Sequence, residues 1–311
     1  MCEYNENINS LEKALDYAIR DYECNEKSVG YGYEIAGNKY WNYLSNKSWE
    51  EFLKSMSSLH RAQYNDADGG ELKVKQGRWG IYPPKMASFG SSSRFIYNIS
   101  KNIECFQFEK LLPTRVGGSA NLDGYITRGD GDVFVEAKCR EIYSSHKTIE
   151  VSNVYEEIYK ELQELYPEFS FKNNGRPIKN GKEDNEHFNC TFKFNGKEII
   201  HFDIKQLICH FLAISANILE NENANKNIKF IYLIFNPNEV IEQVEKESYK
   251  KQIIEIYGDT IKEITDYFNM ELLFESIFKI QAKRLGLEGK KYSLCEFYFA
   301  EEYNYYKEII K

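Results

Sequence analysis

Long apolar runs are missing from this 311-residue chain, and its longest run of aliphatic and aromatic residues is the short segment 230–235. A membrane-spanning helix needs about 20 consecutive apolar residues, so we expect no transmembrane segment. The segment that begins Met1-Cys2-Glu3 is acidic and polar, which is unlike a signal peptide. Together with a mean hydropathy of -0.59, these features indicate a soluble protein without a membrane partner.

Paired cysteines are also missing. The seven cysteines are scattered, their number is odd, and none forms a C-x-x-C motif. This usage is typical of reduced thiols, so we expect a cytoplasmic location. The chain has no Walker loop, HExxH motif, zinc-finger spacing, nucleophile elbow or internal repeat, and so gives no sign of the classes that those motifs define.

Positive charge is in short supply, because 40 lysine and arginine residues face 48 aspartate and glutamate residues, for a net charge of -8. Proteins that coat nucleic acid without regard to sequence depend on lysine and arginine to displace counterions, so the balance counts against that class. It does not exclude a nuclease, since a metal site needs carboxylates and a local basic groove can lie on an acidic body.

Residues 121–141 have the pattern of a β-hairpin. Two runs rich in β-forming residues, 121–127 and 132–139, flank the turn-forming segment 128–131. We therefore predict two antiparallel strands joined by a four-residue loop.

Asp123, Glu136 and Lys138 fall on one face of this predicted hairpin. Side chains alternate along a strand, and a loop of even length pairs Asp123 with Glu136. Facing carboxylates have Cβ atoms roughly 4.5–5.5 Å apart and repel each other, unless a divalent cation such as Mg²⁺ lies between them. A lysine beside them can hold an attacking water or offset charge on a phosphate. The set predicts metal-assisted hydrolysis of a phosphodiester bond.

Asp123 followed by Glu136-Ala137-Lys138 resembles the motif of the PD-(D/E)XK nuclease superfamily, which contains many restriction and repair nucleases. Leu122 stands where the family often has a proline, at a position that varies. The resemblance implies an α/β fold with a restriction-endonuclease-like core, in which helices flank a mixed central sheet. It also implies that Asp123, Glu136 and the Ala137 carbonyl hold Mg²⁺, for which Mn²⁺ can substitute, and that Lys138 positions the attacking water.

The predicted elements around the hairpin follow the core order of that superfamily. They are a helix over about 94–112, the hairpin, an insertion over 144–202, a helix from Asp203 to about residue 219, and a mostly apolar buried strand over 227–235. The resemblance covers a core at residues 91–237. We expect a mostly helical N-terminal region at 1–90 and a helical C-terminal region at 238–311.

Four further residues are candidates for the site by their position. Glu109 lies at the edge of the apolar face of the predicted 94–112 helix, and in the family a helix before the hairpin often supplies another acid for the metal. The alternative is a residue at a helix end that extends its carboxylate to solvent. Gln206 and His210 are four residues apart and share a helix face, although a lone histidine there is more often packed than catalytic. Glu141 is placed to orient the catalytic lysine or the backbone beside it.

Contacts to nucleic acid are expected in a basic segment. Residues 171–182 contain four cations, no acid and several turn-forming residues, which suits either a mobile loop over a phosphate backbone or a solvated surface loop. An arginine in the glycine-rich segment before the hairpin is a further candidate for a phosphate contact, with an ordinary loop as the alternative. The residues concerned are Arg115, Lys172, Arg176, Lys179 and Lys182.

These features predict a metal-dependent endonuclease that acts on double-stranded DNA, with restriction or another defence role as the natural implication of the resemblance. RNA remains open as the substrate. The alternative is a nuclease-like subunit that binds nucleic acid or assembles with a partner without catalysis. The acidic balance favours this alternative slightly, whereas the intact acidic and lysine set argues against it. Many nucleases of this kind act as homodimers, but no residue here identifies a dimer interface.

Overall fold

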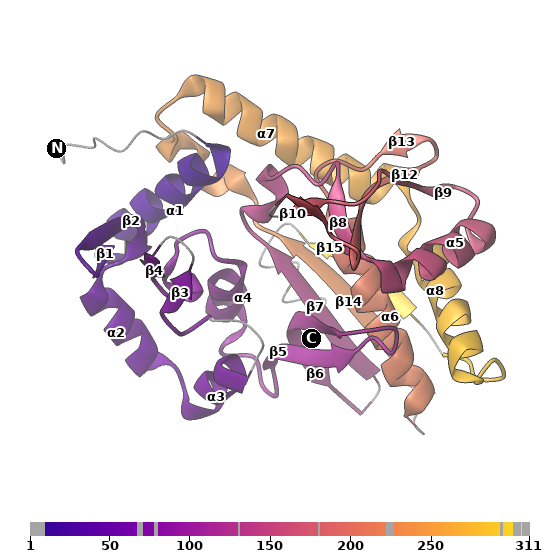
Figure 1. The fold of residues 1–311 in the computed structure, drawn as a ribbon. Helices are drawn as coiled ribbons and strands as arrows, with labels where there is room; N and C mark the ends of the chain where they lie inside the picture. The colour runs from indigo at the N-terminus through magenta and orange to yellow at the C-terminus, as the bar shows by residue number, and fades with distance from the viewer. Residues whose placement is uncertain are drawn as a thin grey trace.

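A mixed five-stranded sheet lies at the centre of the molecule (Figure 1). The computed structural model describes residues 10–66, 71–77, 80–129, 131–179, 181–221, 227–292, 295–300 and 306. The strands of the sheet are β5 (Gln107–Pro113), β6 (Ser119–Thr127), β7 (Gly131–Lys138), β14 (Asn227–Ile234) and β15 (Cys295–Ala300). Their order is β15-β14-β7-β6-β5, with antiparallel pairing from β5 to β7 and parallel pairing from β7 to β15. The mixed α/β class predicted from the sequence is thus confirmed.

The hairpin at the centre of the sheet has the predicted register. β6 and β7 pair with Thr127 opposite Asp132, so the loop has an even length. The ladder on β6 ends at Gly124. In place of the next backbone hydrogen bond, the N–H of Ala137 donates to a carboxylate oxygen of Asp123 at 2.7 Å. Backbone pairing of β6 with β7 therefore ends next to Asp123 and Glu136.

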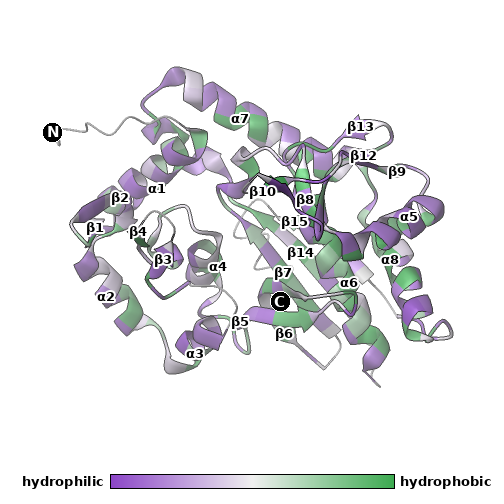
Figure 2. Ribbon diagram, viewed as in Figure 1, coloured by the Kyte–Doolittle hydropathy of each residue, from purple (hydrophilic) through white to green (hydrophobic). Residues whose placement is uncertain are grey.

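Two helices pack against this part of the sheet. α4 (Ser92–Ser100) contacts β6 and β7, while α6 (Ile204–Glu220) contacts β5 and β6. α6 also belongs to the crossover that parallel strands require, here from β7 to β14. Asp203 caps α6 as predicted, because its side chain accepts the backbone N–H of Gln206 at 3.0 Å. Figure 2 shows hydrophobic residues concentrated in β7, β14 and α6.

The long helix predicted before the hairpin is wrong beyond its first half, which is α4. Cys105 adopts a left-handed φ of 59°, and the chain then enters β5. Phe106, Phe108 and Leu112 are buried and are separated by even numbers of residues, so they share one face of an extended chain. Glu109 therefore lies on a strand rather than on a helix.

The N-terminal region contains more strand than expected. Ser10 caps the first helix and Ser45 caps the second. Ala36 and Gly37 both have positive φ and form the turn of an unexpected hairpin. The elements are α1 (Leu11–Lys27), β1 (Tyr31–Ile35), β2 (Asn38–Leu44), α2 (Asn46–Ser55), α3 (Ser58–Asp66), β3 (Lys75–Gly77) and β4 (Gly80–Tyr82).

The insertion at 144–202 forms a small sheet of its own, in which β12 pairs with β8, β9 and β13. Asn195 and Gly196 both have positive φ and form the turn between β12 and β13. The elements are β8 (Ile149–Ser152), α5 (Glu156–Leu165), β9 (Phe169–Asn173), β10 (Ile178–Lys179), β11 (Lys182–Glu183), β12 (His187–Phe194) and β13 (Lys197–Glu198).

The C-terminal region is not entirely helical, which corrects the expectation for 238–311. It contains α7 (Glu247–Lys262), a π-helical turn (Glu263–Tyr267) and α8 (Met270–Leu285), but β15 then returns to the central sheet as its edge strand. The residues around 306 at the end of the chain lie outside the described part. Within that part, no helix combines the length and the apolar character that crossing a membrane requires.

Glu263 fixes the chain just before α6. The residue is 4% exposed, and its carboxylate accepts the backbone N–H groups of Ile200, His201 and Phe202 at 2.9, 3.0 and 2.9 Å. The π-helical turn thus holds the start of the helix that packs on β5 and β6.

Glu263→Ala is expected to lower the free energy of unfolding by roughly 3 kcal/mol, because each buried donor left without an acceptor costs about 1–3 kcal/mol. Glu263→Gln keeps one acceptor oxygen and should lose less. Urea denaturation measures both, with the exposed Glu288→Ala as the matched control. A loss in Glu263→Ala no larger than in this control would contradict the role of the carboxylate.

Candidate active site

Glu136 and Lys138 form a buried pair on β7. Lys138 Nζ lies 2.5 Å from Glu136 Oε1, and both residues are buried. Burial alone would lower the pKa of Lys138, but the charges of Glu136 and of other nearby acidic groups together outweigh it and hold that pKa well above its usual value. The site therefore keeps a charged ammonium group at physiological pH.

Asp123 faces this pair from β6. Burial, followed by the charge of Glu136, raises the pKa of Asp123 well above its usual value, against the opposing effects of Lys138 and the Ala137 N–H. Burial also raises the pKa of Glu136, with Lys138 opposing the shift. Both carboxyl groups are thus harder to ionise than usual, and a bound cation would favour their ionised forms.

The backbone N–H and carbonyl of Ala137 lie on the side of β7 that faces Asp123 on β6. The carbonyl of the next residue, Lys138, accepts the backbone N–H of Phe235 at 2.8 Å, so it points towards the β14 side. Successive carbonyls of a strand point to opposite edges, and the Ala137 N–H already donates to Asp123. The Ala137 carbonyl is therefore directed towards β6, where it can join Asp123 as an oxygen ligand.

Glu109 reaches the site from β5. It lies between two paired positions of the β5–β6 ladder, opposite Asp123, with a left-handed φ of 55°. Its carboxylate accepts hydrogen bonds from the Asn121 amide and from the Ser93 hydroxyl, the latter at 3.3 Å. Burial, followed by the charge of Asp123, raises the pKa of Glu109 to about 8. Glu109 thus lies beside Asp123 as predicted, but it belongs to strand β5 and not to the predicted helix.

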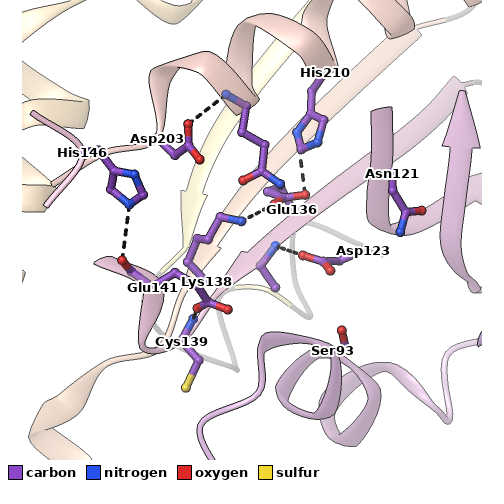
Figure 3. Close-up of polar contacts among 12 residues, drawn as sticks. Ser93, Asn121, Asp123, Glu136, Lys138, Cys139, Glu141, His146, Asp203 and His210 are labelled. Carbon is purple, nitrogen blue, oxygen red and sulfur yellow. Dashed lines mark hydrogen bonds and ion pairs between the residues drawn. The ribbon is translucent and has the colours of Figure 1, made fainter. Parts of the chain in front are cut away.

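Of the predicted supporting residues, His210 lies beside Glu136 and Glu141 lies beside Cys139 (Figure 3). His210 Nδ1 lies 3.6 Å from Glu136 Oε2, and burial lowers the pKa of the ring to about 3, so the ring is neutral. Glu141 Oε2 accepts the backbone N–H of Cys139 at 2.8 Å, so Glu141 orients the backbone rather than the lysine. Gln206 is half-buried one turn before His210 on α6.

Three polar residues at the site were missed by the sequence reasoning. Asn121 and Ser93 donate hydrogen bonds to the carboxylate of Glu109 on β5. Tyr232 on β14 is the residue paired with Glu136 on β7. Asn121 could have been found, because it lies two residues before Asp123 on the same strand face. Ser93 and Tyr232 carry no local signal, since tertiary packing alone brings them to the site.

The residues present fit a metal ion that prefers oxygen ligands. Glu136 Oε2 and Asn121 Oδ1 are buried acceptors without a hydrogen-bond donor, and His210 Nδ1, 3.6 Å from Glu136 Oε2, also makes no hydrogen bond. Buried polar atoms are rarely left unsatisfied in folded proteins. Mg²⁺ takes carboxylate, amide, carbonyl and water oxygens, which is the set that these strands supply.

A second group of side chains that could bind a metal lies in the insertion, outside the candidate active site. Ligand atoms of Glu150, Asp184 and His187 lie within 4.8 Å of one another, and no other trio of such residues in the described part of the chain meets that distance. Lys179 Nζ, however, lies 2.5 Å from Glu150 Oε1 and 2.7 Å from Asp184 Oδ2. An ammonium group therefore already neutralises these carboxylates, and we interpret the cluster as an ion-pair network.

Most of the predicted nucleic-acid contacts are engaged within the protein. Arg115 forms an ion pair with Glu220 at 2.8 Å, and Arg176 donates a hydrogen bond to Asn185. Lys179 forms ion pairs with Glu150 and Asp184. Lys172 and Lys182 are exposed and have no carboxylate partner among the residues described. The segment 171–182 contains the end of β9, an irregular, largely exposed stretch at 174–177, and the two-residue strands of the β10–β11 hairpin except Glu183; its contact with nucleic acid stays a prediction.

Known proteins give no assignment for this chain. No family model, no curated protein and no solved structure matches it. The function must therefore be argued from the site itself.

Proposed function

We propose that this protein is a metal-dependent endonuclease that hydrolyses phosphodiester bonds in DNA, with a restriction-endonuclease-like core. One observation carries the proposal: Asp123, Glu136 and Lys138 converge where β6 and β7 stop pairing. The order α4, β5, β6, β7, α6, β14 supports it, because it contains the core order that the resemblance implies.

Mg²⁺, or Mn²⁺ in its place, would polarise the scissile phosphate and lower the pKa of a bound water. Asp123, Glu136 and the Ala137 carbonyl would hold the ion, with Glu109 as a further oxygen ligand. Burial, together with neighbouring negative charge, raises the carboxyl pKa values, and this supports the assignment because a divalent cation favours the ionised carboxylates.

Lys138 supplies the fixed positive charge of the reaction. Its ammonium is held in a buried position, where charge acts more strongly than in water. From there it can position the attacking water and offset the charge that develops on the phosphate. His210 adds no charge at physiological pH, because its ring is neutral.

The unpaired oxygen of Glu136 favours catalysis over a purely binding or assembly role. A buried acceptor without a donor costs about 1–3 kcal/mol, and a non-catalytic subunit gains nothing from keeping it. Duplex DNA is the proposed partner, in restriction or another defence role, with homodimer formation and a cytoplasmic location as parts of the same proposal.

Incubation with supercoiled plasmid tests this function. We expect nicked or linear DNA with Mg²⁺ or Mn²⁺, none in EDTA, and none with Asp123→Asn in either metal. The same reactions with a structured RNA decide the substrate. Cleavage that persists in EDTA, or that Asp123→Asn leaves unchanged, would refute the proposed site. Calorimetric titration with Mn²⁺ gives an independent readout, since Glu136→Gln should weaken metal binding at least tenfold.

A further inference from the structure

A cavity of about 140 Å³ lies at the carboxyl ends of the parallel strands β7 and β14. Its wall includes Cys139 and Phe235, the residues that directly follow the two strands, together with residues of α1 and α4. In open α/β sheets, ligands bind in the crevice outside the carboxyl ends of the strands. The cavity thus occupies the position in which sheets of this kind most often hold a small molecule.

This cavity is separate from the candidate active site. In Figure 3 the Lys138 side chain points towards Glu136, whereas the Cys139 side chain points away from both. Side chains alternate along an extended chain, so the cavity lies on the opposite side of β7 from Lys138. None of the proposed metal ligands is among the described residues of its wall. A molecule bound here would therefore not be the substrate of the proposed reaction.

A buried guanidinium lines the cavity with unused donors. Arg94 on α4 is 4% exposed. Its Nη2 donates to the carboxylate of Glu23 on α1. Its Nε and Nη1 are also buried, and neither has a hydrogen-bond partner in the described part of the chain. Buried donors are rarely left unsatisfied in folded proteins, so these N–H groups indicate an acceptor that occupies the cavity.

Most of the remaining wall is apolar and partly aromatic. It includes Phe89, Phe95 and Phe235, and the Arg94 guanidinium lies 4.8 Å from the ring centre of Phe89. Asn98, a half-buried residue of α4, adds one amide. An apolar cavity of roughly 150 Å³ is large enough to bind benzene. The space therefore suits one six-membered ring, and an apolar wall favours the displacement of loosely held water by that ring.

The charged groups of the wall balance one another. Arg94 is paired with Glu23, and Glu23 Oε1 lies 3.7 Å from Nζ of Lys27, whose side chain is exposed. Glu239 is exposed at the edge of the same wall. Burial raises the pKa of the Cys139 thiol well above its usual value, so the thiol is uncharged. Among the described residues, two cations thus face two carboxylates, and a charged ligand would lack a counter-charge in a largely apolar space.

We propose that this cavity is a binding site for a small uncharged ring with an amide-type edge, such as a free pyrimidine base. The carbonyl oxygen of that edge accepts the unused N–H groups of Arg94, and its N–H donates to the amide oxygen of Asn98. The ring packs against the phenylalanine side chains. The site goes beyond the proposed nuclease function and does not depend on it.

Ligand-observed NMR titrations with uracil, benzamide and benzoate, in EDTA and without DNA, test the site. We expect uracil and benzamide to bind with a Kd of about 1 mM or below, which is within reach of ligands of this size. Benzoate has nearly the same shape as benzamide but carries a charge. It should therefore bind at least about tenfold more weakly than benzamide.

Two variants of the wall should weaken the binding of uracil. Asn98→Ala should do so about fivefold, because it removes a hydrogen bond from a half-buried position. The double variant Glu23→Gln/Arg94→Met should do so at least about tenfold, and it removes both charges of the buried pair so that neither is left unpaired. Asn238→Ala is the matched control, since Asn238 is exposed next to Glu239 and is not part of the wall.

Binding of uracil that the two wall variants weaken, and that Asn238→Ala leaves unchanged, is the result that supports the site. If neither uracil nor benzamide binds at up to about 10 mM, the cavity holds water only and the proposal is overturned. Binding that Asn98→Ala leaves unchanged also overturns it, because the ligand then lies elsewhere. Benzoate that binds as tightly as benzamide overturns the choice of an uncharged ligand. Plasmid cleavage enters none of these measurements, so this site and the nuclease function are refuted by different results.

Discussion

Lys138→Met is expected to reduce metal-dependent DNA cleavage by about 10³-fold, because removing one preorganised electrostatic group from a buried catalytic site costs about 10²–10³ in rate. Methionine keeps much of the length of the side chain and removes its charge. DNA binding measured in EDTA should change little, since the ammonium is bonded to Glu136 inside the protein. Initial rates of plasmid cleavage give the comparison.

Loss of folding must be separated from loss of catalysis in this variant. Lys138→Met leaves Glu136 without its buried partner, which costs about 3–5 kcal/mol when the carboxylate stays ionised. The double variant Lys138→Met/Glu136→Gln removes both charges, so it should recover stability and remain inactive. Lys279→Met, on the exposed face of α8, should keep full activity. A folded Lys138→Met protein with more than a tenth of the wild-type rate would overturn the role of the lysine.

Without metal, the protein is expected to lose stability as the pH rises from about 4.5 to about 8. Glu109 titrates near 4.5 when unfolded, but its pKa is raised to about 8 by burial and by Asp123 in the folded state. Between these values the folded protein holds a proton that the unfolded chain has released. Stability is then highest below pH 4.5 and falls by about 1.4 kcal/mol per pH unit for each such proton. The raised pKa values of Asp123 and Glu136 act in the same direction.

Urea denaturation from pH 5 to pH 9 in EDTA measures this loss. Glu109→Gln should flatten the profile, whereas Glu104→Gln, at an exposed acid nearby, should not. Mg²⁺ should restore stability most at high pH, because it binds the ionised carboxylates. A wild-type stability that rises with pH, or a slope that Glu109→Gln leaves unchanged, would contradict the assignment.

Local patterns were enough to predict the central hairpin. The four-residue loop and the alternation of its strands determine its register, and with it the face shared by Asp123, Glu136 and Lys138. The Asp203 cap and the buried strand β14 are likewise local signals, and both are present. The candidate catalytic residues therefore follow from the sequence, because they lie within 16 residues of one another on paired strands.

Contacts between distant segments could not be predicted in the same way. Phe106 and Phe108 fit a helical face as well as a strand, and only the left-handed Cys105 ends the helical region before them. Lys179 pairs with Glu150, which lies 29 residues earlier in the chain. Because the segment 171–182 itself contains no acid, its composition suggested that Lys179 was unpaired. The Ala36-Gly37 turn was a readable signal that was overlooked.

The parallel pairing of β14 with β15 has a consequence for synthesis of the protein. β15 leaves the ribosome roughly 60 residues after β14, which corresponds to several seconds at about 5–20 residues per second. During that interval the nascent chain can complete the sheet from β5 to β14, but one edge of its most apolar strand stays open. Open edges of apolar strands recruit other chains. Slower initiation at low temperature, or chaperones that cover this edge, should therefore raise the yield of folded protein more than changes to its surface residues.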